Sequence, residues 1–266
     1  MSPHGDGSAA EGGKGGCALL EALTFDYWQT LLVDAPEGLK RARELRMEGM
    51  RKELGRRGIF LDLEEMNRAY DESGQRIMRI WAQDVDIGPR EQVLIYLDCL
   101  NLDHREAVGE ELLEDLEAAY ATPLLQTLPS LLPGAREVLQ RVRDSGCRIG
   151  LISNTGRTPG YILKSVLEKM GILSFFDVLT FSDELRVRKP NPAIFLHTLE
   201  ELGVKPDRAL HVGDDLRCDV GGAKGVGMKA IHLDRGEEKK TDVHPDGIIE
   251  DLSQLQGLLE RMERFR

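Results

Sequence analysis

Ala22-Leu23-Thr24-Phe25-Asp26-Tyr27-Trp28-Gln29-Thr30-Leu31 is a short apolar run that ends in a single carboxylate and then turns through aromatic and polar residues. This pattern is typical of a strand buried in a parallel sheet, with functional groups placed where the strand stops. A carboxylate there can face a ligand crevice at the carboxyl ends of the strands. Taken alone, Asp26 is better explained as a cap of the following turn.

Three later segments share this character, because in each a polar group follows an apolar run or lies in a predicted loop. In chain order they are a hydroxyl with an amide, a lysine before proline, and a pair of acidic residues: Ser153-Asn154, Lys189-Pro190, and Asp214 with Asp219. The proline biases the lysine away from helix, which suits a residue that projects from a loop. Each residue also has an ordinary structural interpretation, as a helix cap or a surface charge.

The remainder of this region alternates strands with helices. Strands are predicted at 148–152, 177–181, 209–212, 229–233 and 247–249, and helices at 135–144, 161–170, 192–202 and 251–265. Such alternation indicates a parallel sheet covered by helices on both faces. The fold class is therefore α/β, with a Rossmann-like core.

Residues 35–124 have a different pattern, without convincing strands. Four helices are predicted: at 36–55, at 63–81, after Gly88-Pro89, and around 112–120. Asp62 and Asp103 are expected to be N-caps of the second and fourth, and Gly74 is expected to weaken the middle of the second. The chain thus divides into a disordered tail at 1–17, a core at 18–34 and 125–266, and an inserted helical cap at 35–124.

The composition is that of an ordinary globular protein of 266 residues, 41% of them hydrophobic and 30% charged. A net charge of −11 argues against nucleic-acid binding, which needs a basic face. No apolar run is long enough to cross a bilayer, and the glycine-rich amino terminus has no signal-peptide core. Scattered cysteines without metal-ligand spacing predict reduced thiols, so a cytoplasmic protein is expected. Nothing in the sequence points to a particular oligomeric state.

The order of these motifs, Asp26, then Ser153, then Lys189-Pro190, then Gly213-Asp214-x-x-x-x-Asp219, resembles the haloacid dehalogenase (HAD) superfamily of hydrolases. The resemblance covers residues 18–34 and roughly 129–235. It implies that Asp26 is a nucleophile that forms a covalent aspartyl intermediate, which splits one difficult step into two.

The resemblance also implies a metal site. Mg²⁺ prefers hard oxygen ligands and keeps only one or two carboxylates. Asp26, the backbone carbonyl of Trp28 and Asp214 would supply ligands, with Asp219 as a supporting carboxylate. Asp215, by contrast, is expected to cap the following helix.

The remaining roles concern the phosphoryl group. Lys189 would neutralise the carboxylates and the charge that develops during transfer. Ser153 and the backbone of Asn154 would donate hydrogen bonds to a phosphate oxygen. Thr30 matches a position that supports the loop of the nucleophile.

Trp28 departs from the family pattern, since phosphatases of this superfamily usually carry a second Asp two residues after the nucleophile. That acid protonates the leaving alcohol and then activates water, whereas indole has only an N–H donor. Losing a positioned acid/base removes about 10²–10⁴-fold in rate. Three interpretations stay open: a Mg²⁺-dependent phosphatase using a good leaving group or a proton donor from the cap, a 2-haloacid dehalogenase-like enzyme, and an impaired binding protein in which Trp28 fills the pocket wall.

The acidic residues favour the phosphatase. Haloacid dehalogenases need no metal, whereas burying Asp26, Asp214 and Asp219 together without a cation would be unfavourable by repulsion and desolvation. A small phosphorylated substrate is therefore predicted, with a halogenated one as the alternative. The cap would close over the crevice and supply contacts. Candidate contacts from the cap are Arg41, Arg43, Arg46 and Trp81.

Overall fold

The structure is a computed structural model that describes residues 20–102, 108–236 and 242–264. The predicted tail at 1–17 lies outside these residues. Six strands form one parallel sheet in the order β5-β4-β1-β6-β7-β8, which confirms the predicted sheet. Their bounds are β1 Ala22–Phe25, β4 Arg148–Ser153, β5 Val178–Phe181, β6 Ala209–Gly213, β7 Lys229–Leu233 and β8 Gly247–Ile249.

The order of the strands decides where the polar strand ends meet. β1 lies between β4 and β6, and residues 22–25 pair with 148–151 on one side and with 209–212 on the other. Because all three strands run parallel, their carboxyl ends share one edge. Asp26, Ser153 and Asp214 are therefore brought to the same edge of the sheet.

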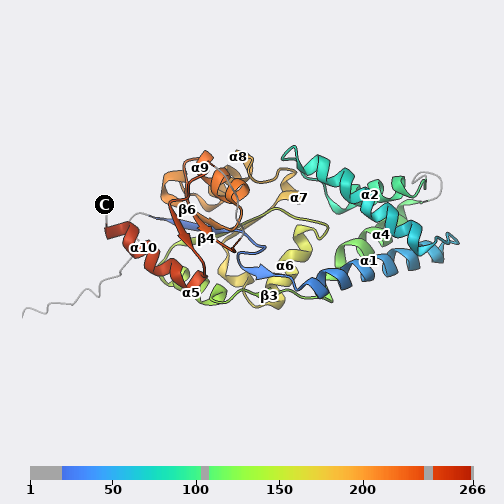
Figure 1. Cartoon of the computed structure of the whole chain (residues 1–266), viewed down its shortest axis with the longest axis horizontal. Coiled ribbons are helices and arrows are strands. Elements are labelled where there is room, and N and C mark those ends of the chain that lie inside the picture. Colours follow the sequence, from blue (N-terminus) through green and yellow to red (C-terminus); the bar gives the residue numbers. More distant parts are fainter. Residues whose placement is uncertain (1–19, 103–107, 237–241, 265–266) are drawn as a thin grey trace, which may run out of the picture.

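Helices cover both faces of the sheet, as predicted (Figure 1). Apolar residues of α5 Ala135–Asp144, α6 Gly160–Lys169 and α10 Leu255–Arg264 pack in one core cluster with Leu23, Phe25, Ile149 and Leu151. On the other face, a second cluster joins Ala22 and Ile152 to α8 Pro192–Leu202, the π-helical turn Leu216–Gly221 and α9 Gly222–Gly225. Successive residues of a strand point to opposite faces of the sheet, so Leu23 and Phe25 join one cluster and Ala22 joins the other. Smaller elements are α7 Ser182–Leu185 and 3-10 turns at Thr122–Leu125, Leu173–Phe175, Pro206–Arg208 and Leu252–Gln254.

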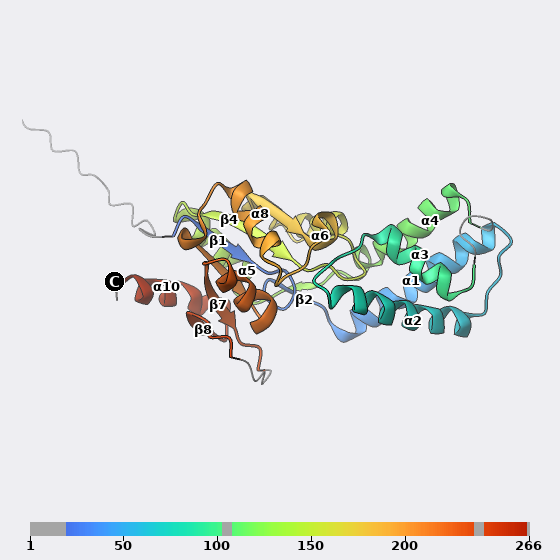
Figure 2. The ribbon, with the colours of Figure 1, turned by 90° about the horizontal axis from the view of Figure 1, so that it is seen from above.

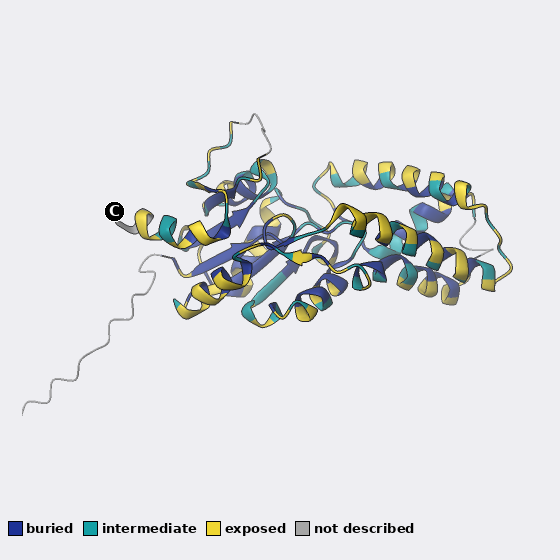
Figure 3. Ribbon diagram, turned by 60° about the horizontal axis from the view of Figure 1, so that its bottom comes forward, coloured by how far each residue is buried: buried dark blue, intermediate teal, exposed yellow. Residues whose placement is uncertain are grey.

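The inserted segment forms four helices at the end of the molecule opposite α10 (Figures 1 and 2). They are α1 Pro36–Arg56, α2 Leu63–Trp81, α3 Pro89–Cys99 and α4 Glu110–Ala121. Their buried faces meet in a cluster of their own, which includes Met50, Met66, Tyr96 and Leu116. The predicted helical insertion thus has an apolar core separate from that of the sheet, as the buried strips of Figure 3 illustrate.

Two expectations within this segment can be compared with the helix ends. The Asp62 carboxylate accepts hydrogen bonds from the backbone N–H groups of Glu64 and Glu65, so its predicted capping role is confirmed. Asp103 lies outside the described residues, and the prediction that it caps α4 is wrong, because the N-cap of that helix is Gly109. Gly109 has extended backbone, and acidic residues in the first turn of α4 offset the positive end of the helix dipole instead.

Gly74 does not interrupt α2, and its role differs from the expected weakness. A Cβ placed at Gly74 would lie 2.6 Å from Nη2 of Arg157, a residue of the core loop after β4. The missing side chain therefore lets the core insert an arginine against the cap helix.

The two connections between core and cap run side by side. β2 Leu32–Val33, just before the cap, pairs antiparallel with β3 Ser130–Leu131, just after it. These two strands are too short to show a period in the sequence, so this sheet was not predicted. Among the described residues, no helix is long and apolar enough to span a membrane, and no disulfide joins Cys99, Cys147 and Cys218.

Candidate active site

The turn after β1 fixes the backbone on either side of Asp26. Asp26 N–H donates to the Val212 carbonyl of β6 at 2.9 Å. The N–H groups of Leu31 and Leu32 both donate to the Tyr27 carbonyl, at 3.1 and 3.0 Å. The pairing of Trp28 with Leu32 is made through the Tyr27 carbonyl and the Gln29 N–H, so the Trp28 carbonyl takes no part in it.

Lys189 lies at the centre of the site and is almost completely buried. Its Nζ is 2.5 Å from Asp26 Oδ1, 2.7 Å from Asp219 Oδ1 and 2.7 Å from the Ile152 carbonyl oxygen. The Asn154 side chain holds the lysine backbone from both sides: its oxygen accepts from Lys189 N–H at 2.8 Å, and its nitrogen donates to the Lys189 carbonyl at 3.0 Å. The predicted lysine therefore reaches the nucleophile candidate, and the amide of Asn154 positions it.

Asp219 comes to the site because the chain turns tightly after β6. A Cβ at Gly213 would lie 2.3 Å from Asp219 Cγ, so only glycine permits this close approach. Asp219 Oδ2 accepts from the Asp215 N–H at 2.9 Å, and its Oδ1 is 3.3 Å from His211 Nε2. His211 is fully buried in β6, and its Nδ1 lies 2.8 Å from the Thr24 hydroxyl of β1.

Three carboxylates gather around the lysine. Asp26, Asp214 and Asp219 can each offer an oxygen such that these atoms lie within 4.8 Å of one another. Three negative charges face the single ammonium of Lys189, which leaves a net charge of about −2 when all are ionised. Burial lowers the pKa of His211, which disfavours a positive charge on the imidazole.

The pKa values of the cluster show that full ionisation of the three carboxylates is unfavourable. Burial raises the pKa of Asp26 to about 8; Lys189 opposes the rise, and Asp219 and Asp214 add to it. Burial likewise raises the pKa of Asp214 to about 6. The pKa of Asp219 falls below its usual range despite burial, because the Lys189 ammonium and His211 lie against it. Burial would lower the pKa of Lys189, but Asp219 and Asp26 raise it above its ordinary value.

Three buried hydroxyls, in the turn after Asp26 and at the end of β4, have no hydrogen-bond partner among the described residues. They belong to Ser153, Thr30 and Tyr27. An unpaired buried hydroxyl costs free energy, and such groups are usually satisfied by water or a ligand. Ser153 ends β4 on the edge that also carries Asp26, so its hydroxyl is available to a ligand bound there.

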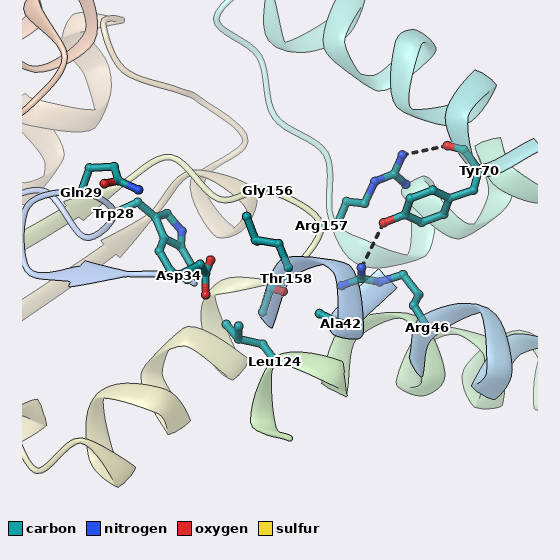
Figure 4. A pocket seen from close by; sticks show the side chains of 11 residues that line it. Trp28, Gln29, Asp34, Ala42, Arg46, Tyr70, Leu124, Gly156, Arg157 and Thr158 are labelled. Atoms are coloured by element: carbon teal, nitrogen blue, oxygen red, sulfur yellow. Dashed lines mark hydrogen bonds between the residues drawn. The ribbon is translucent and has the colours of Figure 1, made fainter. Parts of the chain in front are cut away.

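A cavity of about 380 Å³ lies between the cap and the loops that follow β1 and β4 (Figure 4). Its lining includes none of the charged residues of the cluster, but Trp28 and Gly156 belong to the loops that follow Asp26 and Ser153. The cap contributes Leu39, Ala42, Arg46 and Tyr70. The cavity therefore offers space for the part of a substrate that extends beyond the carboxylates.

The structure separates the cap residues proposed as contacts. Arg46 lines the cavity, whereas Arg41 pairs with Glu44 and Glu48, and Arg43 with Asp71. Trp81 donates to Asp86 at 2.7 Å and lies under the Arg188 guanidinium.

The structure also gives the positions of two further residues singled out in the sequence, and of three residues that were not predicted. Asp215 caps the turn that follows, because its carboxylate accepts from the N–H groups of Arg217 and Cys218. Trp28 is half-buried against the core and lines the cavity. His211, Arg157 and Asp86 were not predicted, since a lone histidine, arginine or aspartate carries no local motif.

Comparison with known proteins agrees with this geometry. Residues 20–227 match the family model of haloacid dehalogenase-like hydrolases. A glyceraldehyde 3-phosphate phosphatase of Methanopyrus kandleri is 26% identical over 239 residues, which cover 88% of this chain and 92% of that protein. A phosphoglycolate phosphatase of Pseudomonas putida is 30% identical over 190 residues, covering 69% of this chain and 66% of that protein.

Solved structures give the same result for the fold. A HAD phosphatase from Thermococcus onnurineus is 26% identical with a TM-score of 0.61, covering 90% of this chain and 98% of that one. A 2-haloacid dehalogenase from Pseudomonas syringae has a TM-score of 0.67 at 23% identity and covers 91% of this chain and 99% of that one, a likeness of fold alone. With its family model matched over most of its length and its polar strand ends gathered at one edge, the chain belongs to the haloacid dehalogenase-like hydrolases.

Proposed function

We propose that the protein is a Mg²⁺-dependent phosphatase of small phosphate esters, with Asp26 as the nucleophile. The observation that carries this proposal is the gathering of three carboxylates around one buried lysine. A net charge near −2 in a buried site is unfavourable without a counterion, and a divalent cation would balance it. A dehalogenase releases halide without a metal, so its reaction does not require carboxylates in excess of the positive charge of the lysine.

The donor set fits Mg²⁺, which prefers oxygen ligands and tolerates only one or two carboxylates. Asp26 and Asp214 would hold it, together with the Trp28 carbonyl that the turn leaves unused. Asp219 is hydrogen-bonded to the Asp215 N–H and paired with Lys189, so it would act from the side. When bound, the cation would keep the Asp26 carboxylate ionised against its raised pKa and draw negative charge away from the phosphate.

The chain's own residues then provide the rest of the reaction. An Asp26 carboxylate oxygen attacks phosphorus, the bond from phosphorus to the alcohol oxygen breaks, and an aspartyl phosphate forms. Lys189 supports the developing charge on the transferring group, and the Ser153 hydroxyl, which has no hydrogen-bond partner within the described part of the chain, donates to a phosphate oxygen. Water then attacks phosphorus, which releases inorganic phosphate and restores the carboxylate. The leaving alkoxide takes its proton from water, because Trp28 offers no acid at the usual position.

The names of the relatives support a phosphatase. Both curated relatives described above are phosphatases, one named for glyceraldehyde 3-phosphate and one for phosphoglycolate. The similarity to the 2-haloacid dehalogenase, at 23% identity, supports a shared fold and not a shared activity.

Hydrolysis of p-nitrophenyl phosphate tests the proposal, since its phenolate leaves without a proton. We expect phosphate release that needs Mg²⁺, is lost with a chelator, and is lost in Asp26→Asn and Asp214→Asn. Asp215→Asn is the matched control: it removes the charge of a neighbouring carboxylate that caps a turn, and because asparagine caps about as well as aspartate, it should keep both stability and activity. Chloride release from 2-chloropropionate without metal, and no phosphate release, would refute the phosphatase.

A further inference from the structure

The cavity lined by Trp28 and Gly156 ends against two guanidinium groups from different parts of the chain. Arg46 comes from α1 of the cap, and Arg157 from the core loop between β4 and α6. Figure 4 shows both side chains converging on Tyr70, with Trp28 and Asp34 at the other end of the cavity.

Among the residues that the structure describes, the groups that hold Arg46 are neutral. Arg46 is 5% exposed, its Nε donates to the Tyr120 carbonyl at 2.6 Å, and its Nη1 donates to the Tyr70 hydroxyl at 3.0 Å. The guanidinium carbon lies 5.0 Å from the centre of the Tyr120 ring. These bonds use two of the five N–H donors of the guanidinium. The others remain able to reach a ligand.

Arg157 has the same kind of surroundings. Its Nη2 donates to the Tyr70 carbonyl at 2.9 Å, and its Nη1 donates to the Tyr120 hydroxyl. The guanidinium carbon lies 3.7 Å above the Tyr70 ring. The bare backbone of Gly74 provides the room for this approach.

Neither guanidinium is paired with a carboxylate of the described residues. Burying a charge is costly unless it is paired, and aromatic faces and carbonyls offset only part of the cost. Among the described residues that line the cavity, the one acid is Asp34, and no ion pair joins it to Arg46 or Arg157. Its carboxyl thus does not serve as the counterion, and the cap end of the cavity carries two uncompensated positive charges in a chain of net charge −11.

We propose that Arg46 and Arg157 bind a second anionic group of the substrate, a carboxylate or a second phosphate. This inference rests on the phosphatase function proposed above and names the class of ester: a phosphomonoester whose alcohol part carries another negative charge. The scissile phosphate lies at the carboxylate cluster, the carbon chain passes Trp28, and the second anion enters between the two guanidinium groups, which suit planar or tetrahedral oxyanions.

Matched substrates test the inference in the wild-type protein with Mg²⁺. We compare 2-phosphoglycolate, which has a carboxylate, and 1,3-propanediol bisphosphate, which has a second phosphate, with the neutral 2-hydroxyethyl phosphate. At least one anionic ester should exceed the neutral one about tenfold or more in kcat/KM. Whichever ester is preferred tells which anion the site takes. Equal kcat/KM values for all three esters overturn the inference.

Variants then assign the preference to the two arginines. Arg46→Gln and Arg157→Gln should each reduce the preference for the anionic ester by about tenfold or more. Arg43→Gln is the control: Arg43 lies on the same helix and over the same Tyr70 ring at 4.9 Å, but pairs with Asp71 and does not line the cavity. It should keep the preference. If both esters lose activity in parallel in the two variants, the arginines only hold the cap together, and the inference fails.

Binding without turnover separates this inference from the proposed function. Phosphonoacetate carries a carboxylate, and methylphosphonate lacks it, so each can be tested for protection against thermal unfolding. Greater protection by phosphonoacetate, lost in Arg46→Gln and kept in Arg43→Gln, supports the anion site even if no ester is hydrolysed. A bisphosphonate, 1,3-propanebisphosphonate, tests a second phosphate in the same way. If neither phosphonoacetate nor the bisphosphonate protects more than methylphosphonate, the inference is overturned, even if phosphatase activity is present.

Discussion

The Asp86 carboxylate of the cap lies 2.5 Å from Nη1 of Arg188, the residue immediately before Lys189. Asp86 is 1% exposed, and its oxygens accept from five donors, which come from both the cap and the core. These donors are Trp81 Nε1, the Ile87 N–H, Arg188 Nη1, the Thr155 hydroxyl and the Ser182 hydroxyl. The α2–α3 loop of the cap is therefore anchored in the core beside the catalytic lysine candidate.

The backbone follows the same contact. Asp86 N–H donates to the Arg186 carbonyl at 3.2 Å, and Arg188 N–H donates to the Asp84 carbonyl at 3.0 Å, which gives an antiparallel bridge between Val85 and Val187. On its other side, the lysine loop is held by Asn154. Displacing the cap loop would thus disturb the segment that positions Lys189.

Asp86→Ala should therefore lower kcat as well as stability. Loss of the Asp86 carboxylate leaves the Arg188 guanidinium with one hydrogen-bonded partner, the Thr155 carbonyl. The neighbouring Lys189 would then be displaced, and a small displacement of a catalytic group can cost about 10²-fold in rate. We expect kcat and kcat/KM for p-nitrophenyl phosphate to fall together by about ten- to hundredfold, since the lysine supports the transition state. Steady-state kinetics with a parallel thermal melt measures both effects.

Glu91→Gln is the control for this variant. It breaks another cap–core ion pair, between Glu91 and Arg186, but that pair is exposed and should contribute less than about 1 kcal/mol. A loss of kcat of the same size in both variants would show that any loosening of the cap reduces activity and that Asp86 has no particular role in placing the lysine.

Trp28→Asp should restore the acid that the family pattern leads one to expect. A carboxyl at this position can protonate the leaving alcohol, and such a group contributes about 10²–10⁴-fold. We expect the gain with alkyl phosphates and a much smaller one with p-nitrophenyl phosphate, whose phenolate needs no proton. Trp28→Asn, of similar size to the aspartate, controls for the lost indole packing. Equal turnover of an alkyl phosphate in the two variants would argue that the missing acid does not limit the rate.

The sequence predicted those parts of the site that depend on local order. Asp26, Ser153 and Asp214 each end or follow a strand, and neighbouring parallel strands bring such residues together. Gly213 and Asp219 were predicted through a short motif with fixed spacing. Such features need no knowledge of distant contacts.

The contacts between cap and core could not be predicted in this way. Asp86 and Arg188 are 102 residues apart, and nothing in either local sequence distinguishes them from surface charges. Gly74 was expected to weaken its helix because helix propensity takes account of the isolated helix and not of the segments packed against it. The clearance that Arg157 requires is a property of two packed segments, and it appears only once they are folded together.

Gly74→Ala should reverse the usual effect of this substitution. In a helix interior, alanine is more favourable than glycine by about 0.5–1 kcal/mol, but here the new Cβ meets Arg157 Nη2. That nitrogen is fixed by its bond to the Tyr70 carbonyl, so the contact cannot relax freely. We expect a lower free energy of unfolding in the wild-type background and a gain of about 0.5–1 kcal/mol in an Arg157→Ala background. Stabilisation in both backgrounds, measured by urea unfolding, would contradict the proposed contact.

Asp34→Asn should stabilise the protein at neutral pH and not in acid. Burial raises the pKa of Asp34 from an ordinary value of 3.8 to about 6 in the folded state. Between these values the folded protein holds this proton more tightly than the unfolded chain, so its stability falls as the pH rises from about 4 to 6. Above pH 6 the wild-type protein carries a half-buried charge, which asparagine removes. Thermal melts at pH 4 and pH 8 should show a gain in Tm for the variant at pH 8 only. Asp207→Asn, which changes an exposed acid, is the control and should alter Tm little at either pH. If Asp34→Asn instead raises Tm equally at pH 4 and pH 8, ionisation of Asp34 is not the source of the gain.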